Sequence, residues 1–329
     1  MNTYQMLKGA IDFEEVKDQR KDIDILVNVK RERIQRRPED REEVEKAIEE
    51  LQAKIPELDA ILAKEPPLPE LPPHKPLIKV SGVLEEFETL CVKGYFTERE
   101  YAPEEFARKE ENEQFGALLI AMMGNISWSA VNLRTKIRLY NDYHFVRGKI
   151  NGIPFHGWLG LTTVKIGDYV ELVVTEQEEH YAVYALTKPE LGTISIIPWC
   201  NKGIRSKAWD EVFYTCCIFL LIAVVCLGAI LFPDGSSFWD GADIFTLWLM
   251  FFAAVFSLYS FVVSIKKPWR SIKLAQDIFS VLGFPNPQDI SLEKLTKKRL
   301  REIKSNPLPE NSEEVLPDKY CFMSHYYYY

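Results

Sequence analysis

Residues 144–161, HFVRGKINGIPFHGWLGL, decide how the middle of this chain folds. Polar and apolar side chains alternate on both sides of the dipeptide Asn151-Gly152, and a period of two is typical of a half-buried strand. Asn-Gly between two such runs is the strongest short-range hairpin signal, because both turn positions need positive φ. The stretch therefore predicts antiparallel strands over His144–Ile150 and Ile153–Leu161.

Further short strands are expected around this hairpin. They are Ile78–Val83, Tyr169–Val174, Tyr181–Leu186 and Thr193–Ile197, with a tight turn at 165–168. Such a series predicts a small antiparallel β domain over residues 77–207, a barrel or sandwich of SH3-like or OB-like size. An uncharged insertion at 115–133 interrupts it. Its polar residues and glycines favour a helix on the barrel or at the membrane surface over a third membrane span.

Two uncharged segments follow the β domain, Val212–Phe232 and Ile244–Ile265. At about 1.5 Å per helical residue, each can cross a hydrocarbon layer of roughly 30 Å. Buried core helices are the alternative, but a soluble helix of this length nearly always has a polar stripe, and neither segment has one. We therefore predict a transmembrane helical hairpin over residues 208–268, which together with the β domain makes the chain an α+β membrane protein.

Basic residues flank the two outer ends of this hairpin, and acidic residues occupy its loop. The flanking residues are Lys202, Arg205, Lys207, Lys266, Lys267, Arg270 and Lys273, and the loop carries Asp234, Asp240 and Asp243. The positive-inside rule then places both termini in the cytoplasm, which predicts a multi-pass protein in contact with the lipid bilayer. Neither span carries an ionisable residue that would indicate an ion pathway.

Residues 1–65 are expected to form a helical, coiled-coil-like arm. Apolar residues recur at alternating spacings of four and three, namely Val44, Ile48, Leu51, Ile55, Leu58 and Leu62. A helix within the same arm can fill this seam as a hairpin, and self-association through residues 13–62 is the alternative. Residues 65–76 read EPPLPELPPHKP, and the proline-rich part, 66–76, predicts an extended linker between the arm and the β domain.

Residues 269–329 are expected to be a cytoplasmic tail. Within it, Ser291–Ile303 is basic and predicts a helix that lies against anionic lipid. The final residues, Tyr326–Tyr329, fit no pattern that we can interpret.

The sequence offers few candidates for chemistry. Its five histidines stand outside the known catalytic and metal-binding motifs, and its six cysteines form no CxxC pair. We therefore predict no catalytic residue, no cofactor, no metal site and no enzymatic activity. A surface pair of His156 and His180 is geometrically feasible, although ordinary strand histidines are the commoner explanation. The candidate partner-binding residues are His156, Trp158, Tyr181 and Tyr184, of which the aromatic ones fit core positions equally well.

Charge narrows the class of partner. The formal net charge is −8, which disfavours nucleic acid because phosphate binding needs a basic face. An acidic protein is better suited to a basic protein partner.

Four runs carry a resemblance to a known group of proteins: Val146–Trp158, Lys165–Glu171, Tyr181–Tyr184 and Pro198–Gly203, the last leading into the two apolar segments. In this order they resemble a family of bacterial membrane proteins usually labelled type VI secretion system effectors. Some membrane proteins of this kind are encoded beside toxins as immunity proteins. The likeness covers about residues 77–267 and supplies no catalytic residues.

The resemblance implies a place in the bacterial inner membrane and a role in a toxin system. The favoured hypothesis is a non-enzymatic immunity protein that binds and neutralises a cognate toxin through its cytoplasmic domain. The alternatives are an effector that inserts into a target membrane and permeabilises it, and a membrane scaffold that assembles through its N-terminal arm.

Overall fold

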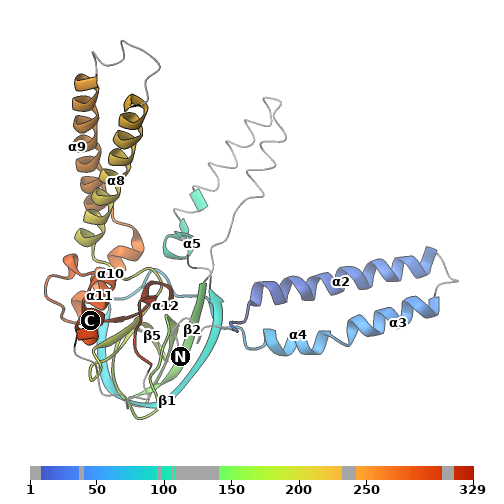
Figure 1. The fold of residues 1–329 in the computed structure, drawn as a ribbon. Helices are drawn as coiled ribbons and strands as arrows, with labels where there is room; N and C mark the ends of the chain where they lie inside the picture. The colour runs from blue at the N-terminus through green and yellow to red at the C-terminus, as the bar shows by residue number, and fades with distance from the viewer. Residues whose placement is uncertain are drawn as a thin grey trace.

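Figure 1 shows a computed structural model of the chain, which describes residues 9–36, 41–94, 96, 98–104, 107–108, 141–231, 242–305 and 315–329. The described residues form an α+β protein built on a closed five-stranded β-barrel, which confirms the predicted class. The predicted apolar insertion at 115–133 and the end of the first predicted span, Phe232, lie outside the described residues.

The barrel consists of β1 (Ile78–Gly94), β2 (Asn141–Ile150), β3 (Ile153–Leu159), β4 (Tyr169–Glu176) and β5 (Tyr181–Lys188). β1 is long enough to serve two neighbours, because its first part pairs with β4 and its second part with β2. The register of β1 shifts between Leu84 and Glu86, where it passes from one partner to the other. The ring then runs β1, β2, β3, β5, β4 and back to β1.

Two local features let this ring close. Asn151 and Gly152 have φ of 51° and 78°, so the predicted two-residue turn between β2 and β3 is confirmed. β3 and β5 then meet as parallel neighbours, with Gly157 opposite Val183. A Cβ atom on Gly157 would lie 2.3 Å from the carbonyl oxygen of Val183, so only glycine allows this approach.

Apolar side chains pack on both sides of the barrel wall. The cluster inside the barrel consists of Leu84, Val146, Ile150, Phe155, Leu159, Val170, Leu172, Val174, Tyr181, Val183 and Leu186. A second, larger cluster joins the outer face of β5 and β6 (Thr193–Ile196) to the C-terminal helices. Burial on both faces explains why β5 reads as a nearly continuous apolar run.

The segment 269–329, predicted as a cytoplasmic tail, packs part of its described residues into this outer core. α10 (Arg270–Val281) buries Leu274, Ile278 and Phe279 in it, and β7 (Tyr326–Tyr328) pairs with β6 at the edge of the sheet. Figure 1 shows the C-terminus beside the barrel. The elements between them are η3 (Pro287–Asp289), α11 (Leu292–Ser305) and α12 (Cys321–Ser324).

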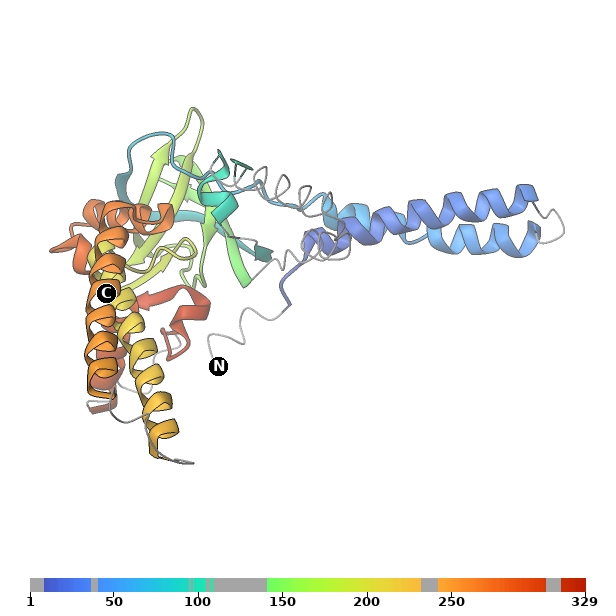
Figure 2. The ribbon, with the colours of Figure 1, turned by 90° about the horizontal axis from the view of Figure 1, so that it is seen from above.

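The N-terminal helices form a smaller, separate core. α2 (Phe13–Arg36) lies along α3 (Arg41–Gln52) and α4 (Ile55–Leu62), and the three extend away from the barrel (Figures 1 and 2). Ile23 and Val27 of α2 are buried against seam residues Val44 and Ile48. The apolar seam of α3 is therefore filled from within the chain.

The predicted spans correspond to α8 (Ile204–Leu231) and α9 (Ala242–Lys266), which run side by side away from the barrel (Figures 1 and 2). Rings meet between them, with the centroids of Trp209 and Phe261 5.3 Å apart. Within α9, Trp248–Lys266 is 19 residues long, has a mean hydropathy of 2.0 and exposes most of its side chains. This helix is thus long and apolar enough to span a membrane.

Salt bridges join the base of α8 to α11 and to the segment that precedes α8. Lys202 contacts Asp210 at 3.1 Å and Glu293 at 3.4 Å, and Lys294 contacts Asp210 at 3.1 Å. The short helix α5 (Glu98–Tyr101) adds a further tie, because Tyr101 Oη donates a hydrogen bond to the carbonyl oxygen of Pro198. The base of α8 is therefore linked to α11, and α5 is linked to the segment between β6 and α8.

Candidate functional site

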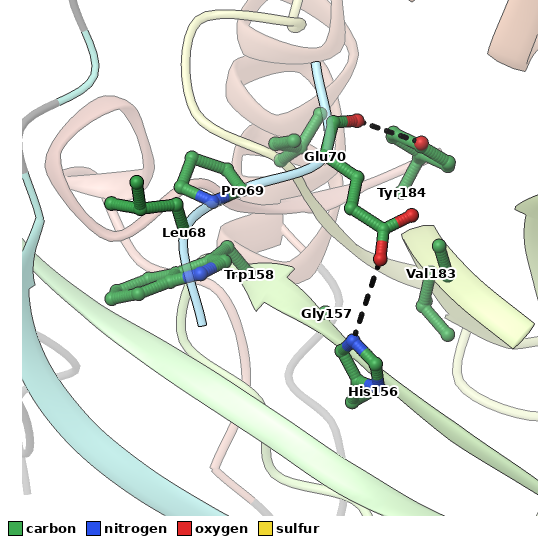
Figure 3. Close-up of a pocket in the computed structure, with 10 residues that line it drawn as sticks. Leu68, Pro69, Glu70, His156, Gly157, Trp158, Val183 and Tyr184 are labelled. Atoms are coloured by element: carbon green, nitrogen blue, oxygen red, sulfur yellow. Dashed lines mark hydrogen bonds and ion pairs between the residues drawn. The ribbon is translucent and has the colours of Figure 1, made fainter. Parts of the chain in front are cut away.

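Part of the proline-rich segment 66–76, predicted as an extended linker, lies directly on the barrel. We call residues 67–71 the strap. Trp158 Nε1 donates a hydrogen bond of 2.9 Å to the carbonyl oxygen of Pro67, and Tyr184 Oη donates one of 2.8 Å to that of Glu70. Leu71 is only 9% exposed and belongs to the outer core. Figure 3 shows the strap crossing β3 and β5 above these side chains.

This contact follows from the chemistry of proline and of aromatic side chains. A proline-rich segment has few backbone N–H groups, but its carbonyl oxygens remain strong acceptors. Aromatic rings that carry a donor suit such a segment, as in domains that bind extended proline-rich peptides. Burial raises the pKa of Tyr184 to about 12, so its phenol stays protonated and can donate. The barrel thus holds a proline-rich segment of its own chain.

The strap brings a carboxylate next to two histidines. Glu70 Oε1 lies 3.8 Å from His156 Nε2 and 3.6 Å from His180 Nε2. His156 is in β3 and His180 directly precedes β5, so the parallel pairing of these strands places the two rings together. The rings stack with centroids 4.3 Å apart and an interplanar angle of 24°.

Further contacts fix the carboxylate in this position. Gln177 Nε2 donates a hydrogen bond of 2.6 Å to Glu70 Oε2, which leaves Oε1 directed at the histidines. His180 Nε2 is inaccessible to solvent and has no hydrogen-bond partner among the described residues. Burial, and next the neighbouring His180, lower the pKa of His156, while Glu70 opposes this shift. The imidazole of His156 is therefore neutral at pH 7 and has a lone pair available.

A shallow hollow adjoins this group. It is lined by Leu68, Pro69, Glu70, His156, Gly157, Trp158, Ala182, Val183, Tyr184 and Ile197. Its empty volume is about 280 Å³, open solvent included, which is below the range of about 300–1,000 Å³ typical of pockets for small organic ligands. A water molecule or an ion fits this space better than an organic substrate.

Three of the four predicted partner-binding residues gather here, and one does not. His156, Trp158 and Tyr184 line the hollow beneath the strap. Tyr181 is 9% exposed and packs in the barrel interior, because it has the opposite orientation to its neighbours along β5. The aromatic members of the set therefore contact the chain's own strap or its core. Glu70 and Gln177 complete the group and were not predicted from the sequence.

The other buried histidines have structural positions. His144 Nδ1 accepts a hydrogen bond of 3.1 Å from the Thr162 backbone, and burial lowers its pKa to about 4. His325 packs against the rings of Tyr143 and Trp199, and burial lowers its pKa to about 4 as well. The thiol of Cys200 is fully buried, which raises its pKa to about 12 and leaves it unreactive as a nucleophile.

Comparison of the chain with protein-family models, with curated proteins and with solved structures finds no match. The resemblance to membrane proteins of type VI secretion systems therefore stays a prediction.

Proposed function

We propose that this chain is a membrane-anchored binding protein whose barrel is held at the cytoplasmic face of a bacterial inner membrane. We further propose, from the resemblance described above, that it is an immunity protein that neutralises a cognate toxin. The observation that carries the anchoring is the exposed apolar surface of α8 and α9, on helices that extend from the barrel.

The exposure of these helices supports a lipid environment. Phe213 is 71% exposed, Leu220 67% and Leu258 65%, although each is strongly apolar. An apolar surface this continuous is rare on a soluble monomer and marks contact with lipid or protein. We propose that both α8 and α9 cross the membrane as a hairpin, because the second predicted span forms α9 and most of the first forms α8.

Charge supports the orientation of this hairpin. The basic residues lie at the end of the hairpin that is next to the barrel. The positive-inside rule assigns this end to the cytoplasm. α11 adds an exposed basic face near the base of α8, formed by Lys294, Lys297, Lys298, Arg299, Arg301 and Lys304. Anionic headgroups attract such a face, so α11 is suited to lie near the membrane surface.

The path of the strands supports an OB-like barrel over an SH3-like one. One long first strand is shared between β2 and β4, and β3 closes the ring against β5. In OB-like barrels the face of the second and third strands is a common ligand-binding surface. β3 carries His156 and Trp158, so the strap contacts this face. The net charge of −8 favours a basic protein over nucleic acid as the partner.

The N-terminal arm provides further surface for a partner. We propose that α2, α3 and α4 form a helical hairpin that acts as one projecting unit, since its seam is filled internally. Self-association through residues 13–62 would have to use other faces, such as the exposed Ile25, Leu26 and Val29 of α2. This arrangement favours an arm that binds a partner protein over an arm that joins copies of the chain in a scaffold.

The proposal is tested by growth of a bacterium that expresses the full chain, alone and together with the toxic domain encoded beside its gene. We expect normal growth with the chain alone, restored growth in the presence of the toxin, and recovery of the toxin with the detergent-solubilised chain. Growth arrest with membrane depolarisation by the chain alone would contradict the proposal and favour a membrane-permeabilising effector. Harmless expression without rescue would also contradict the immunity role and leave the scaffold hypothesis in its place.

A further inference from the structure

We propose that Glu70, His156 and His180 bind one divalent metal ion of the zinc class, which fastens the strap to the seam between β3 and β5. This inference is independent of the toxin hypothesis, because it rests only on the geometry of three side chains. Two imidazoles and one carboxylate form a ligand set that zinc accepts, with a fourth position left for water or for a ligand from another molecule.

The spacing of the three groups fits a shared ion better than direct contacts. The distances of 3.8 Å and 3.6 Å from Glu70 Oε1 to the two Nε2 atoms are too long for hydrogen bonds. Two ligands bound at about 2.0–2.1 Å to a tetrahedral ion lie about 3.3 Å apart. The three ligand atoms lie within 4.8 Å of one another, so the separation of any two has to shorten by at most about 1.5 Å for them to share an ion.

The surroundings hold the carboxylate of Glu70 in place before an ion binds. Glu70 is fixed twice, through its carbonyl oxygen by Tyr184 and through Oε2 by Gln177. His180 Nε2 faces Oε1 at 3.6 Å and lacks both solvent and a hydrogen-bond partner among the described residues. Outer contacts that orient a ligand in this manner are characteristic of metal sites. An ion would satisfy the nitrogen of His180 and the oxygen of Glu70 together.

Binding requires one local movement. The rings of His156 and His180 are stacked, so their lone pairs run nearly side by side instead of converging. A rotation of one imidazole about its side-chain bonds turns its Nε2 toward the ion without moving a strand. Both side chains are about one-third exposed or less, at 27% and 30%, which leaves room for this rotation and a path for the ion.

The ion would link segments that are far apart in the chain. Glu70 follows the N-terminal arm, whereas His156 and His180 belong to the barrel. A bound ion therefore restrains the strap and, through it, the base of the arm. Loading with metal is expected to protect the strap from proteases, because binding to the folded state opposes local opening.

Metal binding by the purified full chain tests this proposal. The chain is prepared in detergent with a tag that lacks histidine, stripped with a chelator and titrated with Zn²⁺ by calorimetry. Co²⁺ serves as a spectroscopic substitute, because its visible absorption reports coordination by nitrogen and oxygen. We expect one ion per chain, and Zn²⁺ should slow proteolysis of the strap.

Substitutions assign the binding to these residues. Glu70→Gln, His156→Ala and His180→Ala should each weaken Zn²⁺ binding at least 10-fold, and Gln177→Ala about 10-fold or more through the carboxylate that it orients. His74→Ala is the matched control, because His74 is an exposed histidine of the same proline-rich segment, and it should leave the affinity unchanged. Circular dichroism of each metal-free variant checks the fold. Glu70→Gln preserves the size of the side chain. If a histidine variant fails to fold, the Zn²⁺ affinity of Glu70→Gln shows whether the proposed ligands bind the ion.

Two results would overturn the proposal. The first is the absence of stoichiometric Zn²⁺ binding, which would make the three side chains a polar contact only. The second is binding with equal affinity in wild type and in all the ligand variants, which would assign it to other groups, such as the exposed thiols of Cys216 and Cys217.

Discussion

Trp158 Nε1 lies 2.9 Å from the carbonyl oxygen of Pro67, so a residue of β3 holds a segment that is 91 residues earlier in the chain. The same strand places His156 below the neighbouring Glu70. The aromatic side chains beneath the strap thus position the Glu70 carboxylate even when no metal ion is bound. Their removal should affect the strap first and the barrel less.

Trp158→Phe is expected to loosen the strap. The substitution keeps an aromatic ring but leaves the Pro67 carbonyl without its donor, at a cost of about 1 kcal/mol. Limited proteolysis should cut residues 67–71 faster, with little change in the far-ultraviolet circular dichroism. Trp269→Phe is the control, because Trp269 is 63% exposed, and it should not change the rate of cleavage. Equal cleavage in both variants would show that the Trp158 hydrogen bond does not hold the strap.

Tyr327→Ala is expected to destabilise the whole barrel. The ring is completely buried in the outer core, its hydroxyl accepts a hydrogen bond of 3.3 Å from Asn201, and its strand pairs with β6. Removal of a buried aromatic ring costs about 3–5 kcal/mol. Chemical denaturation in detergent measures the loss in the free energy of unfolding. Tyr320→Ala is the control, because the Tyr320 side chain is partly exposed, and it should change this free energy little. A small effect at Tyr327 would mean that β7 is dispensable to the fold.

The stability of the barrel should fall as the pH drops below about 6.5. The folded-state pKa values of His144 and His325 are both lowered to about 4 from 6.5, so the unfolded chain binds more protons between these values. Their stabilising contribution is complete above pH 6.5, is lost progressively toward pH 4 and is constant below it. Each histidine adds at most about 1.4 kcal/mol per pH unit to the slope.

His325→Phe tests this titration directly. Neither nitrogen of His325 has a hydrogen-bond partner among the described residues, so phenylalanine removes the titrating group without breaking a described hydrogen bond. The free energy of unfolding, measured from pH 7.5 to pH 4, should then vary less steeply than in the wild type. An unchanged slope would contradict the assignment of His325 as a buried, neutral side chain.

Ile48→Ala is expected to destabilise the arm but not the barrel. Ile48 is buried against Ile23 and Val27 of α2, and truncation of such a side chain costs about 2–5 kcal/mol. Hydrogen exchange should accelerate in α2, α3 and α4 only. Leu26→Ala, at a position 47% exposed on the same arm, is the control and should change exchange little. A change from oligomer to monomer in Ile48→Ala would instead show that the seam also joins chains.

Features set by neighbouring residues could be predicted from the sequence. The turn at Asn151-Gly152 follows from local φ preferences, and the turn at 165–168 is fixed by a hydrogen bond of 2.8 Å from the Lys165 backbone to Asp168. The alternating strands and the uncharged helices also show their periods within a short window. The predicted membrane location depends on this local information alone.

Features that depend on distant pairing could not be predicted. Tyr326–Tyr328 form a strand because β6 offers an open edge, and nothing in a run of tyrosines indicates that partner. The parallel approach of β3 and β5 is likewise set by ring closure and not by the sequence of either strand. The cluster of Glu70, His156 and His180 depends on both that closure and the path of the strap, so no spacing motif could have identified it.

The central claim is that α8 and α9 anchor the barrel in a membrane, and alkaline carbonate extraction of bacterial membranes that contain the full chain tests it most directly. We predict that the chain stays with the membrane at high pH, when peripheral proteins are released, and enters solution only with detergent, because lipid covers the exposed apolar surface of these helices. Release of the intact chain by carbonate alone would contradict the account, since the apolar helices would then have to be covered by protein.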